Sequence, residues 1–234
     1  TLNVLQAATE AGVKRVIITS SIAAICYNNE RGLKAKFTEE DWTDISDPAA
    51  TAYIKSKALT ERAAWDFADQ NADAPEITSV NPSLVLGPVL EKDFGTSATL
   101  IKRIMDGSFP ALPNLGFPIV DVRSVAELHI MAMENEAAAG QRFIAGGDFF
   151  WMTDVAQILK EAYPNRKVTT GKLPDFMVRL MALFDQETRF LLKELNKTRR
   201  VDISKAKNVL GWKPIPEKEA VLATAESLIQ HGLV

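Results

Sequence analysis

The chain has 234 residues, of which 47% are hydrophobic and 24% charged, and its formal net charge is -3. These values are typical of a globular protein and give no basic surface for nucleic acid or an anionic membrane. No apolar run approaches the roughly 18 residues that a membrane helix needs, and a single cysteine, Cys26, excludes an internal disulfide. We therefore expect a cytoplasmic protein without a nucleic-acid or membrane partner.

The first part of the chain alternates helix and strand patterns. Apolar residues recur at helical spacing from the second residue, and Gly12 ends that helix. The β-branched run VKRVIITSS predicts a strand buried on both faces, closed by Ser20 and Ser21. A polar stretch over 28–50 is typical of a long loop, and the run TAYIKSKALTERAAWDFADQ predicts a helix from Thr51 to about residue 71.

A second strand is predicted within ITSVNPSLVLGP. Because Pro82 cannot donate to a ladder, we expect regular pairing to end near Asn81, where the chain leaves the sheet edge. A strand, a crossover helix and a strand indicate a right-handed βαβ unit in a parallel sheet.

The rest of the chain predicts helices among irregular segments. Ser124 and Glu127 are typical of a capping box that opens a helix. The run LPDFMVRLMALF has apolar residues at helical spacing, which predicts a packed face or the roof of an apolar pocket. Those apolar residues are Phe176, Met177, Leu180, Met181 and Phe184. Further elements are a helix over 97–105, the strand RFIAGG, a helix from Thr153 or Asp154 to Pro164, and a helix from Ser204 to Leu210 before Gly211.

Tyr53 and Lys57 stand one helical turn apart, so their side chains project from one face of the predicted helix. The same spacing recurs at Tyr163 and Lys167, but Pro164 ends the helix there, so that pair shares no face. A tyrosine is a weak acid at neutral pH, and a nearby ammonium ion makes it a better proton donor. The context favours Tyr53 and Lys57 as an acid–base pair.

The strand before this helix ends in Thr19, Ser20 and Ser21. Ligands of open parallel sheets bind at the carboxyl ends of the strands. We therefore expect these three hydroxyls to converge with the ammonium of Lys57. Two serines in isolation would more simply end a strand.

Six segments, in the same order, resemble the extended short-chain dehydrogenase/reductase family of the NAD-dependent epimerase/dehydratase superfamily, above all its dihydroflavonol-reductase and carbonyl-reductase group. They are VKRVIITSSIAAI, EEDWTD, YIKSKALTERAAWDFA, NPSLVLGP, VDVRSVAELH and DISKAKNVLGWKP. The resemblance implies an α/β fold: a partial doubly wound parallel sheet of Rossmann type, without its N-terminal strands, and a small C-terminal α/β substrate lobe. It assigns 1–90 to the C-terminal part of the dinucleotide-binding domain and 91–234 mainly to the substrate-binding lobe, with 118–150 returning to the sheet.

The resemblance implies NAD(P)H-dependent reduction of a ketone or aldehyde, so the expected partner is a small-molecule carbonyl substrate. Tyr53 would give a proton to the carbonyl oxygen, Ser21 would hydrogen-bond that oxygen, and Lys57 would tune the phenol and bind the cofactor ribose. The implied cofactor contacts are Thr19, Tyr53, Lys57, Pro82, Ser83 and Val85. NADP is the expected cofactor, with NAD as the alternative. No metal is implied, and a homodimer is compatible with the resemblance.

The chain departs from the family's pattern at its start. No Gly-x-Gly-x-x-Gly or Gly-x-x-Gly-x-x-Gly turn precedes the first predicted strand. With βαβ units of about 30 residues, the resemblance implies that roughly 100 residues of the nucleotide half are absent. Because that turn holds the pyrophosphate, we expect this chain alone to bind a dinucleotide weakly.

Two other functions stay open. Arg199 and Arg200 lie where related epimerases bind a diphosphate, so a nucleotide-sugar epimerase or dehydratase with the same triad is one alternative, although exposed arginines are more often a solvated face. A non-catalytic cofactor-binding or structural protein is the other. Bland roles are expected for the remaining polar and aromatic candidates. These are packing for Cys26, a loop anchor for Trp42, loop orientation for Asp121 and Arg123, and no metal ligation by His129 or His231.

Overall fold

A computed structural model describes residues 1–28, 36–47, 50–184, 189 and 192–234. The chain divides into two compact units, each with its own buried core. The first unit comprises Thr1–Ser83, Ser124–Gly146 and Arg200–Pro214, and the second comprises Leu84–Arg123, Gly147–Arg199 and Ile215–Val234. In the described part of the chain, no helix has the length and hydropathy needed to cross a bilayer.

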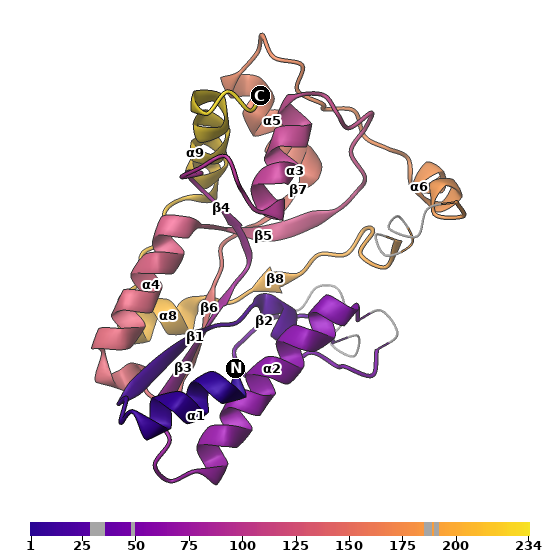
Figure 1. Cartoon of the computed structure of the whole chain (residues 1–234). Coiled ribbons are helices and arrows are strands. Elements are labelled where there is room, and N and C mark those ends of the chain that lie inside the picture. The colour runs from indigo at the N-terminus through magenta and orange to yellow at the C-terminus, as the bar shows by residue number, and fades with distance from the viewer. Residues whose placement is uncertain (29–35, 48–49, 185–188, 190–191) are drawn as a thin grey trace. The chain divides into compact units, whose positions relative to one another are not determined.

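The first unit is built on a three-stranded parallel sheet with the order β1-β3-β6. Its strands are β1 (Arg15–Thr19), β3 (Glu76–Pro82) and β6 (Arg142–Ala145). Helices α1 and α2 cover one face, and α4 and α8 lie on the other (Figure 1). The helices are α1 (Leu2–Glu10), α2 (Ala52–Gln70), α4 (Val122–Glu134, in this unit from Ser124) and α8 (Ser204–Leu210). The predicted parallel α/β sheet is confirmed.

Strand alternation decides which residues meet α2. Successive side chains of a strand point to opposite faces. Val16 and Ile18 of β1 pack with Leu5 of α1 and Ala64 of α2, together with Ile77 of β3. The residues that continue these rows toward the carboxyl ends of the strands are polar, and they also face α2.

The pairing of β3 differs from the sequence prediction. β3 is the central strand, and its register continues to Pro82, which lies opposite Ala145. Proline lacks only the donor, so the ladder is completed by the next residue: the Ser83 amide donates to the Ala145 carbonyl at 2.9 Å. The chain therefore leaves from the middle of the sheet.

The predicted loop over 28–50 contains a short strand. β2 (Lys36–Phe37) pairs in parallel with β8 (Arg200–Val201), and the one-turn helix η1 (Ile22–Ala24) precedes this stretch. Phe37 is buried in a cluster with Val201 and Ile144, which accounts for one apolar residue in a polar segment. Residues 29–35 and 48–49 of the predicted loop lie outside the described residues.

The second unit has a mixed three-stranded sheet with the order β4-β5-β7, in which β4 and β5 are parallel and β7 is antiparallel. Its strands are β4 (Leu84–Leu86), β5 (Gly116–Asp121) and β7 (Phe149–Trp151), and its helices are α3 (Thr96–Met105), α5 (Met152–Ala162), α6 (Asp175–Met181) and α9 (Glu217–Gln230). Ile101, Ile119, Leu159 and Leu228 form the centre of its core, one from each of α3, β5, α5 and α9.

Most of the predicted helix limits agree with the structure, and two differ. α8 ends at Leu210, and Gly211 follows with a φ of 72°, as expected for a glycine stop. α4 begins at Val122, so the predicted capping box at Ser124 is wrong: the Asp121 carboxylate accepts the Arg123 amide at 2.8 Å instead. α5 begins at Met152, slightly earlier than predicted.

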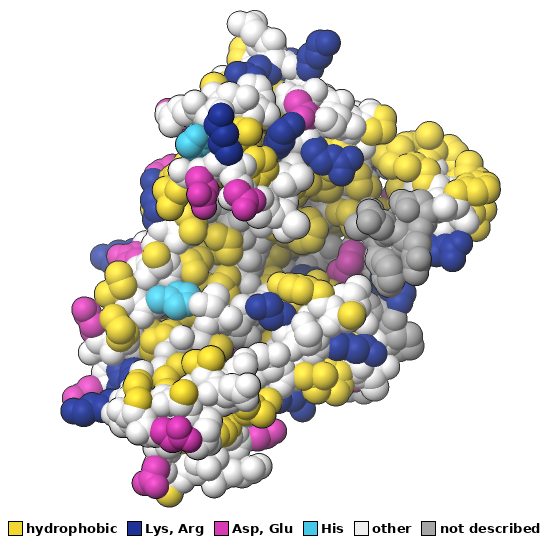
Figure 2. All heavy atoms as spheres, viewed as in Figure 1, with side chains coloured by type: hydrophobic (Ala, Val, Ile, Leu, Met, Phe, Trp, Pro, Cys, Tyr) yellow, Lys and Arg dark blue, Asp and Glu magenta, His cyan; other side chains and the backbone are white. Residues whose placement is uncertain are grey.

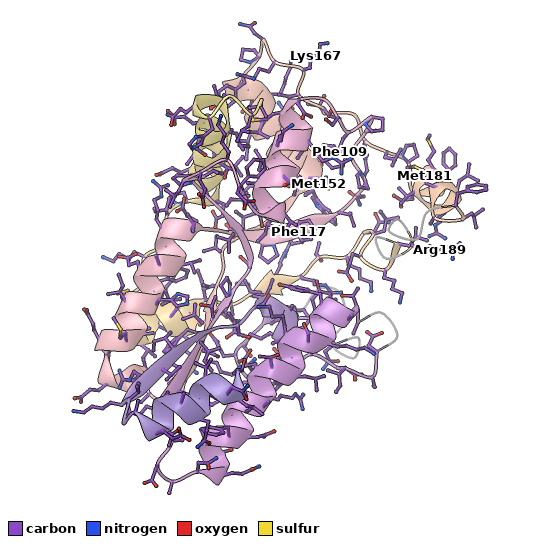
Figure 3. The ribbon with its side chains drawn as sticks, in the orientation of Figure 1. Phe109, Phe117, Met152, Lys167, Met181 and Arg189 are labelled. Carbon is purple, nitrogen blue, oxygen red and sulfur yellow. The ribbon has the colours of Figure 1, made fainter. Side chains whose placement is uncertain are left out.

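The apolar run on α6 does not form the predicted packed face. Only Val178 and Ala182 of this segment are buried, at 1% and 3% exposure. The expected core residues are 41–86% exposed and form a hydrophobic patch on α6 (Figure 2), with Met181 among side chains that point away from the helix (Figure 3). Arg189 donates to the carbonyls of Ala182 and Leu183 at the end of this segment. Because the run is apolar on nearly every side, its periodicity could not identify the narrow buried face.

Candidate active site

Tyr53 and Lys57 lie on the first turns of α2. The Thr51 hydroxyl accepts the Ile54 amide at 3.3 Å and thereby fixes the start of the helix. Tyr53 is 59% exposed, and the Lys57 Nζ lies 6.0 Å from the centroid of its ring. An accessible phenol with an ammonium ion beside it is therefore held at the helix start.

Ser20 and Ser21 follow β1 but have different environments. The Ser20 side chain is buried and donates to the Glu61 carboxylate. Ser21 is half-buried and caps η1, because its Oγ accepts the Ala23 amide at 3.1 Å. A hydroxyl that accepts one bond still has its own proton to donate. Of the two serines, Ser21 is the one whose donor is not committed to Glu61.

Glu61 is the centre of a buried polar cluster between α2 and the sheet. Its carboxylate accepts from Ser20, from Asn81 Nδ2 at 2.7 Å, from Ser79 Oγ at 2.9 Å and from Arg142 Nε at 2.7 Å. Burial alone would raise the pKa of the Glu61 carboxyl, but attraction to Arg142 and the donated hydrogen bonds outweigh it and lower the pKa. Glu61 is therefore ionised and held by side chains of β3 and β6 and by Ser20, which follows β1.

Thr19 points to the opposite face of the sheet. Its Oγ1 lies 2.8 Å from His129 Nε2, and His129 Nδ1 lies 2.8 Å from the Val125 carbonyl. Because a carbonyl only accepts, the Nδ1 of His129 donates in this contact, and Nε2 faces the Thr19 hydroxyl. The predicted convergence of three hydroxyls is wrong, since strand alternation sends Thr19 and Ser20 to different faces.

Ser83 follows the last paired residue of β3, and its hydroxyl oxygen has an unusual environment. Its Oγ is buried and has no hydrogen-bond partner among the residues that the structure describes. Pro82, beside it, is buried in the ladder. A buried hydroxyl without a partner costs free energy. The hydrogen-bonding capacity of the Ser83 hydroxyl is thus unused among the described residues.

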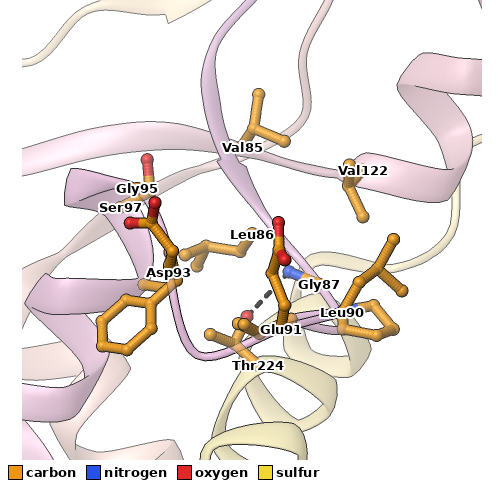
Figure 4. Close-up of a pocket in the computed structure, with 14 residues that line it drawn as sticks. Val85, Leu86, Gly87, Leu90, Glu91, Asp93, Gly95, Ser97, Val122 and Thr224 are labelled. Atoms are coloured by element: carbon orange, nitrogen blue, oxygen red, sulfur yellow. Dashed lines mark hydrogen bonds between the residues drawn. The ribbon is translucent and has the colours of Figure 1, made fainter.

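Val85 lies in the second unit and lines a pocket of about 360 Å³ there. Figure 4 shows the pocket beneath Val122, with the Gly87 amide donating to Thr224 Oγ1 at 2.7 Å. Gly87 has a φ of 131°, and a Cβ there would stand 2.7 Å from a Val122 methyl. The close approach of these two segments therefore requires glycine.

The other residues singled out in the sequence make contacts typical of structural roles. Tyr163 and Lys167 share no helical face, as predicted, because α5 ends at Ala162. Among the described residues, no cluster could hold a metal ion. Cys26 is completely buried, and the Arg142 and Arg62 guanidinium groups lie 3.8 and 4.8 Å from the centroid of the Trp42 ring. Arg123 forms an ion pair with Asp121 at 2.8 Å, and Arg199 forms one with Glu194 at 2.9 Å. His231 contacts the Val89 carbonyl at 3.1 Å.

The sequence reasoning missed Glu61, Asn81 and Arg142. One signal was present: the buried stripe of α2 runs through Ile54, Ala58, Glu61 and Ala64, so a carboxylate occupies a position where the helix pattern expects an apolar residue. A buried charge needs a partner. The identity of that partner depends on strands distant in the sequence.

The parallel sheet, with a serine after one strand and a tyrosine and lysine on the next helix, defines a Rossmann-type α/β protein. The family model for the NAD dependent epimerase/dehydratase family matches residues 1–146, and the chain belongs to this family.

Similar proteins of known activity include reductases. Cinnamoyl-CoA reductase CAD2 of Medicago truncatula is 36% identical over 70% of this chain and 51% of its own length. The NADPH-dependent methylglyoxal reductase GRE2 of Saccharomyces cerevisiae is 34% identical over 93% of this chain and 64% of its own length. The chain therefore spans about half to two thirds of these curated relatives.

Solved structures agree with this fold. Gre2 of Candida albicans in complex with NADPH has a TM-score of 0.76 and 28% identity, covering 98% of this chain and 68% of that chain. The yeast methylglyoxal/isovaleraldehyde reductase Gre2 complexed with NADPH has a TM-score of 0.75 and 29% identity, covering 99% and 69%.

Proposed function

We propose that the whole protein reduces a ketone or aldehyde with NADPH and that Ser21, Tyr53 and Lys57 carry out the proton chemistry. The observation that carries this proposal is the exposed Tyr53 phenol with the Lys57 ammonium 6.0 Å from its ring centroid, on the helix after the Ser21 strand. The names of the relatives support it, since GRE2 is an NADPH-dependent reductase of methylglyoxal.

The residues present fit the nicotinamide end of a dinucleotide. Ser83 offers a buried hydroxyl without a partner among the described residues, and Lys57 offers donors to ribose hydroxyls. Pro82 would add an apolar contact with the ring. The chain has no glycine-rich turn for the pyrophosphate.

The proton chemistry follows from the positions of the three side chains. When bound, NADPH would supply the hydride. Tyr53 would donate its phenolic proton to the carbonyl oxygen as charge develops there. Ser21 would donate a hydrogen bond to the same oxygen, because its acceptor side is used by the Ala23 amide. Lys57 would stabilise the phenolate that Tyr53 leaves, through its positive charge.

A nucleotide-sugar epimerase or dehydratase is the second candidate, favoured by the family description. One contact argues against it: Arg199, expected to hold a diphosphate, already donates two hydrogen bonds to the Glu194 carboxylate, each at 2.9 Å. A bidentate pair of this kind leaves less of the guanidinium for a phosphate.

The test is an assay of the full-length protein with NADPH and a panel of aldehydes and ketones, with the alcohol identified as product. We expect NADPH oxidation in proportion to alcohol formed. Failure to oxidise NADPH with any carbonyl, together with thermal stabilisation by UDP- or dTDP-sugars, would support the epimerase. NADPH binding without turnover of any substrate would support a non-catalytic protein.

A further inference from the structure

We propose that Glu61 is a positioning residue of the active site, which holds Ser21 in register with Tyr53 and Lys57 through hydrogen bonds to Ser20 and Asn81. This inference rests on the proposed function and adds to it a residue that touches neither substrate nor cofactor.

Glu61 lies on α2, the helix that also carries Tyr53 and Lys57. Tyr53, Lys57 and Glu61 follow one another at intervals of four residues, so they form a row along the helix. The first two are accessible, whereas Glu61 is 1% exposed and faces the sheet. Glu61 is therefore the point at which the helix that carries Tyr53 and Lys57 contacts the polar residues of the sheet.

Hydrogen bonds connect Glu61 to Ser21 through Asn81. Asn81 Nδ2 donates to the Glu61 carboxylate at 2.7 Å and also to the Ser21 carbonyl at 3.2 Å. The Asn81 amide is fixed in this orientation because both partners, a carboxylate and a carbonyl, only accept and therefore need the Nδ2 donor. Ser21 is thus tied through its own carbonyl and through the side chain of its neighbour Ser20 to one carboxylate.

Arg142 holds the Glu61 carboxylate in place. Arg142 on β6 donates to Glu61 at 2.7 Å and to the carbonyl of Asp41 at 2.9 Å, and it also donates to the Glu39 carbonyl. Its guanidinium carbon lies 3.8 Å from the Trp42 ring centroid. The carboxylate is therefore attached to β3, to β6, to the residue that follows β1 and, through Arg142, to the segment over 39–42.

A second contact restricts the rotation of α2 against the sheet. Ala23 of η1 packs with Ile54 and Ala50 in a separate buried cluster. This cluster lies beside Tyr53 in the sequence of α2, whereas the Glu61 cluster lies two turns further on. Two attachments along one helix, one apolar and one ionic, define both its distance from Ser21 and its rotation.

The experiment compares kcat and KM of the full-length protein for Glu61→Gln, Glu61→Asp and the control Asp66→Asn. Asp66 is an exposed acid on the same helix. We expect both Glu61 variants to lose about tenfold to hundredfold in kcat, because small misplacements of reacting groups have effects of this size. KM for NADPH should remain within about twofold, and Asp66→Asn should match the wild type.

Combination with Ser21→Ala separates positioning from general damage. If Glu61 acts through Ser21, Glu61→Gln should cost no more than about twofold once Ser21 is alanine. A control with a core cavity, Ile77→Ala near the other end of β3, should retain kcat below its unfolding temperature. A full additional loss in the Ser21→Ala background, or an unchanged kcat in Glu61→Gln and Glu61→Asp, overturns the proposal.

Hydrogen exchange gives a readout that needs no turnover. The amides from Ser20 to Cys26 should exchange faster in Glu61→Gln than in the wild type, in Asp66→Asn or in Ile77→Ala. If the wild type reduces no carbonyl, the proposed function fails but this arm still decides the positioning claim. Unchanged exchange over these amides would overturn the positioning claim even if carbonyl reduction is found.

Discussion

The Ser20 hydroxyl donates to the buried Glu61 carboxylate. The bond distinguishes two adjacent serines that look equivalent in the sequence, because it commits the Ser20 donor to Glu61, whereas the Ser21 hydroxyl accepts the Ala23 amide and keeps its own proton. The proposed role of Ser21 as the donor to a substrate oxygen depends on this difference. It also explains why the helix carrying Tyr53 has a carboxylate in its buried stripe.

Lys57 can be tested against its neighbour Lys55. We expect Lys57→Met to raise KM for NADPH and to lower kcat by about 10² or more, because it removes both the proposed ribose donor and the charge beside Tyr53. Steady-state kinetics of the full-length protein measure both effects. Lys55→Met removes a charge from another side of the same helix and should change neither. Equal effects of the two variants would mean that Lys57 contributes only through the general surface charge of the helix.

Asp106 gives a pH-dependent contribution to stability. Burial alone would raise its pKa, but hydrogen bonds from Lys102, at 2.7 Å, and Ser108 lower the pKa to about 2 from its ordinary 3.8. A depressed folded pKa stabilises the fold above the unfolded value, and this stabilisation is lost as pH falls through about 4 toward about 2.

Urea unfolding of Asp106→Asn and the wild type checks this effect. Near neutral pH the variant should be less stable by about 1 kcal/mol after allowance for solvent screening. The difference should vanish near pH 2. Asp93→Asn, at an exposed aspartate of the same unit, is the control. A difference that stays constant down to about pH 2 would contradict the assigned cause.

The exposed face of α6 makes a prediction about stability. Val178→Ala should lower the free energy of unfolding by about 2 kcal/mol, because it leaves a cavity in the core. Phe176→Ala, which removes a larger side chain that is 68% exposed, should change it by less than about 0.5 kcal/mol. Chemical denaturation measures both. A larger loss for Phe176→Ala would mean that the originally expected packed face exists.

The sequence was sufficient where local signals decide the structure. The helix from Ala52 follows from its Thr51 cap and its periodic apolar residues, and the end of α8 follows from Gly211, which has a φ of 72°. The strand β1 follows from its β-branched residues, but its residues are half-buried or exposed, so the predicted burial on both faces is wrong. The roles of Ser21, Tyr53 and Lys57 stay predictions.

The sequence was insufficient where distant segments decide the structure. Phe37 forms β2 only because Val201 lies beside it, and nothing near Phe37 in the chain encodes that pairing. The partners of Glu61 come from β3, from β6 and from Ser20, which directly follows β1. The buried face of α6 is selected by the core beneath Val178, since the helix is apolar on most sides.

The most direct test of the proposed chemistry compares the two tyrosines of the Tyr-x-x-x-Lys pattern. Tyr53 is exposed beside Lys57, whereas Tyr163 packs against the core of the second unit, and burial raises the pKa of its phenol. The rate of NADPH-dependent carbonyl reduction by the full-length protein should fall by about 10² to 10⁴ in Tyr53→Phe. It should stay within about twofold of the wild type in Tyr163→Phe. An unchanged rate in Tyr53→Phe would contradict the account.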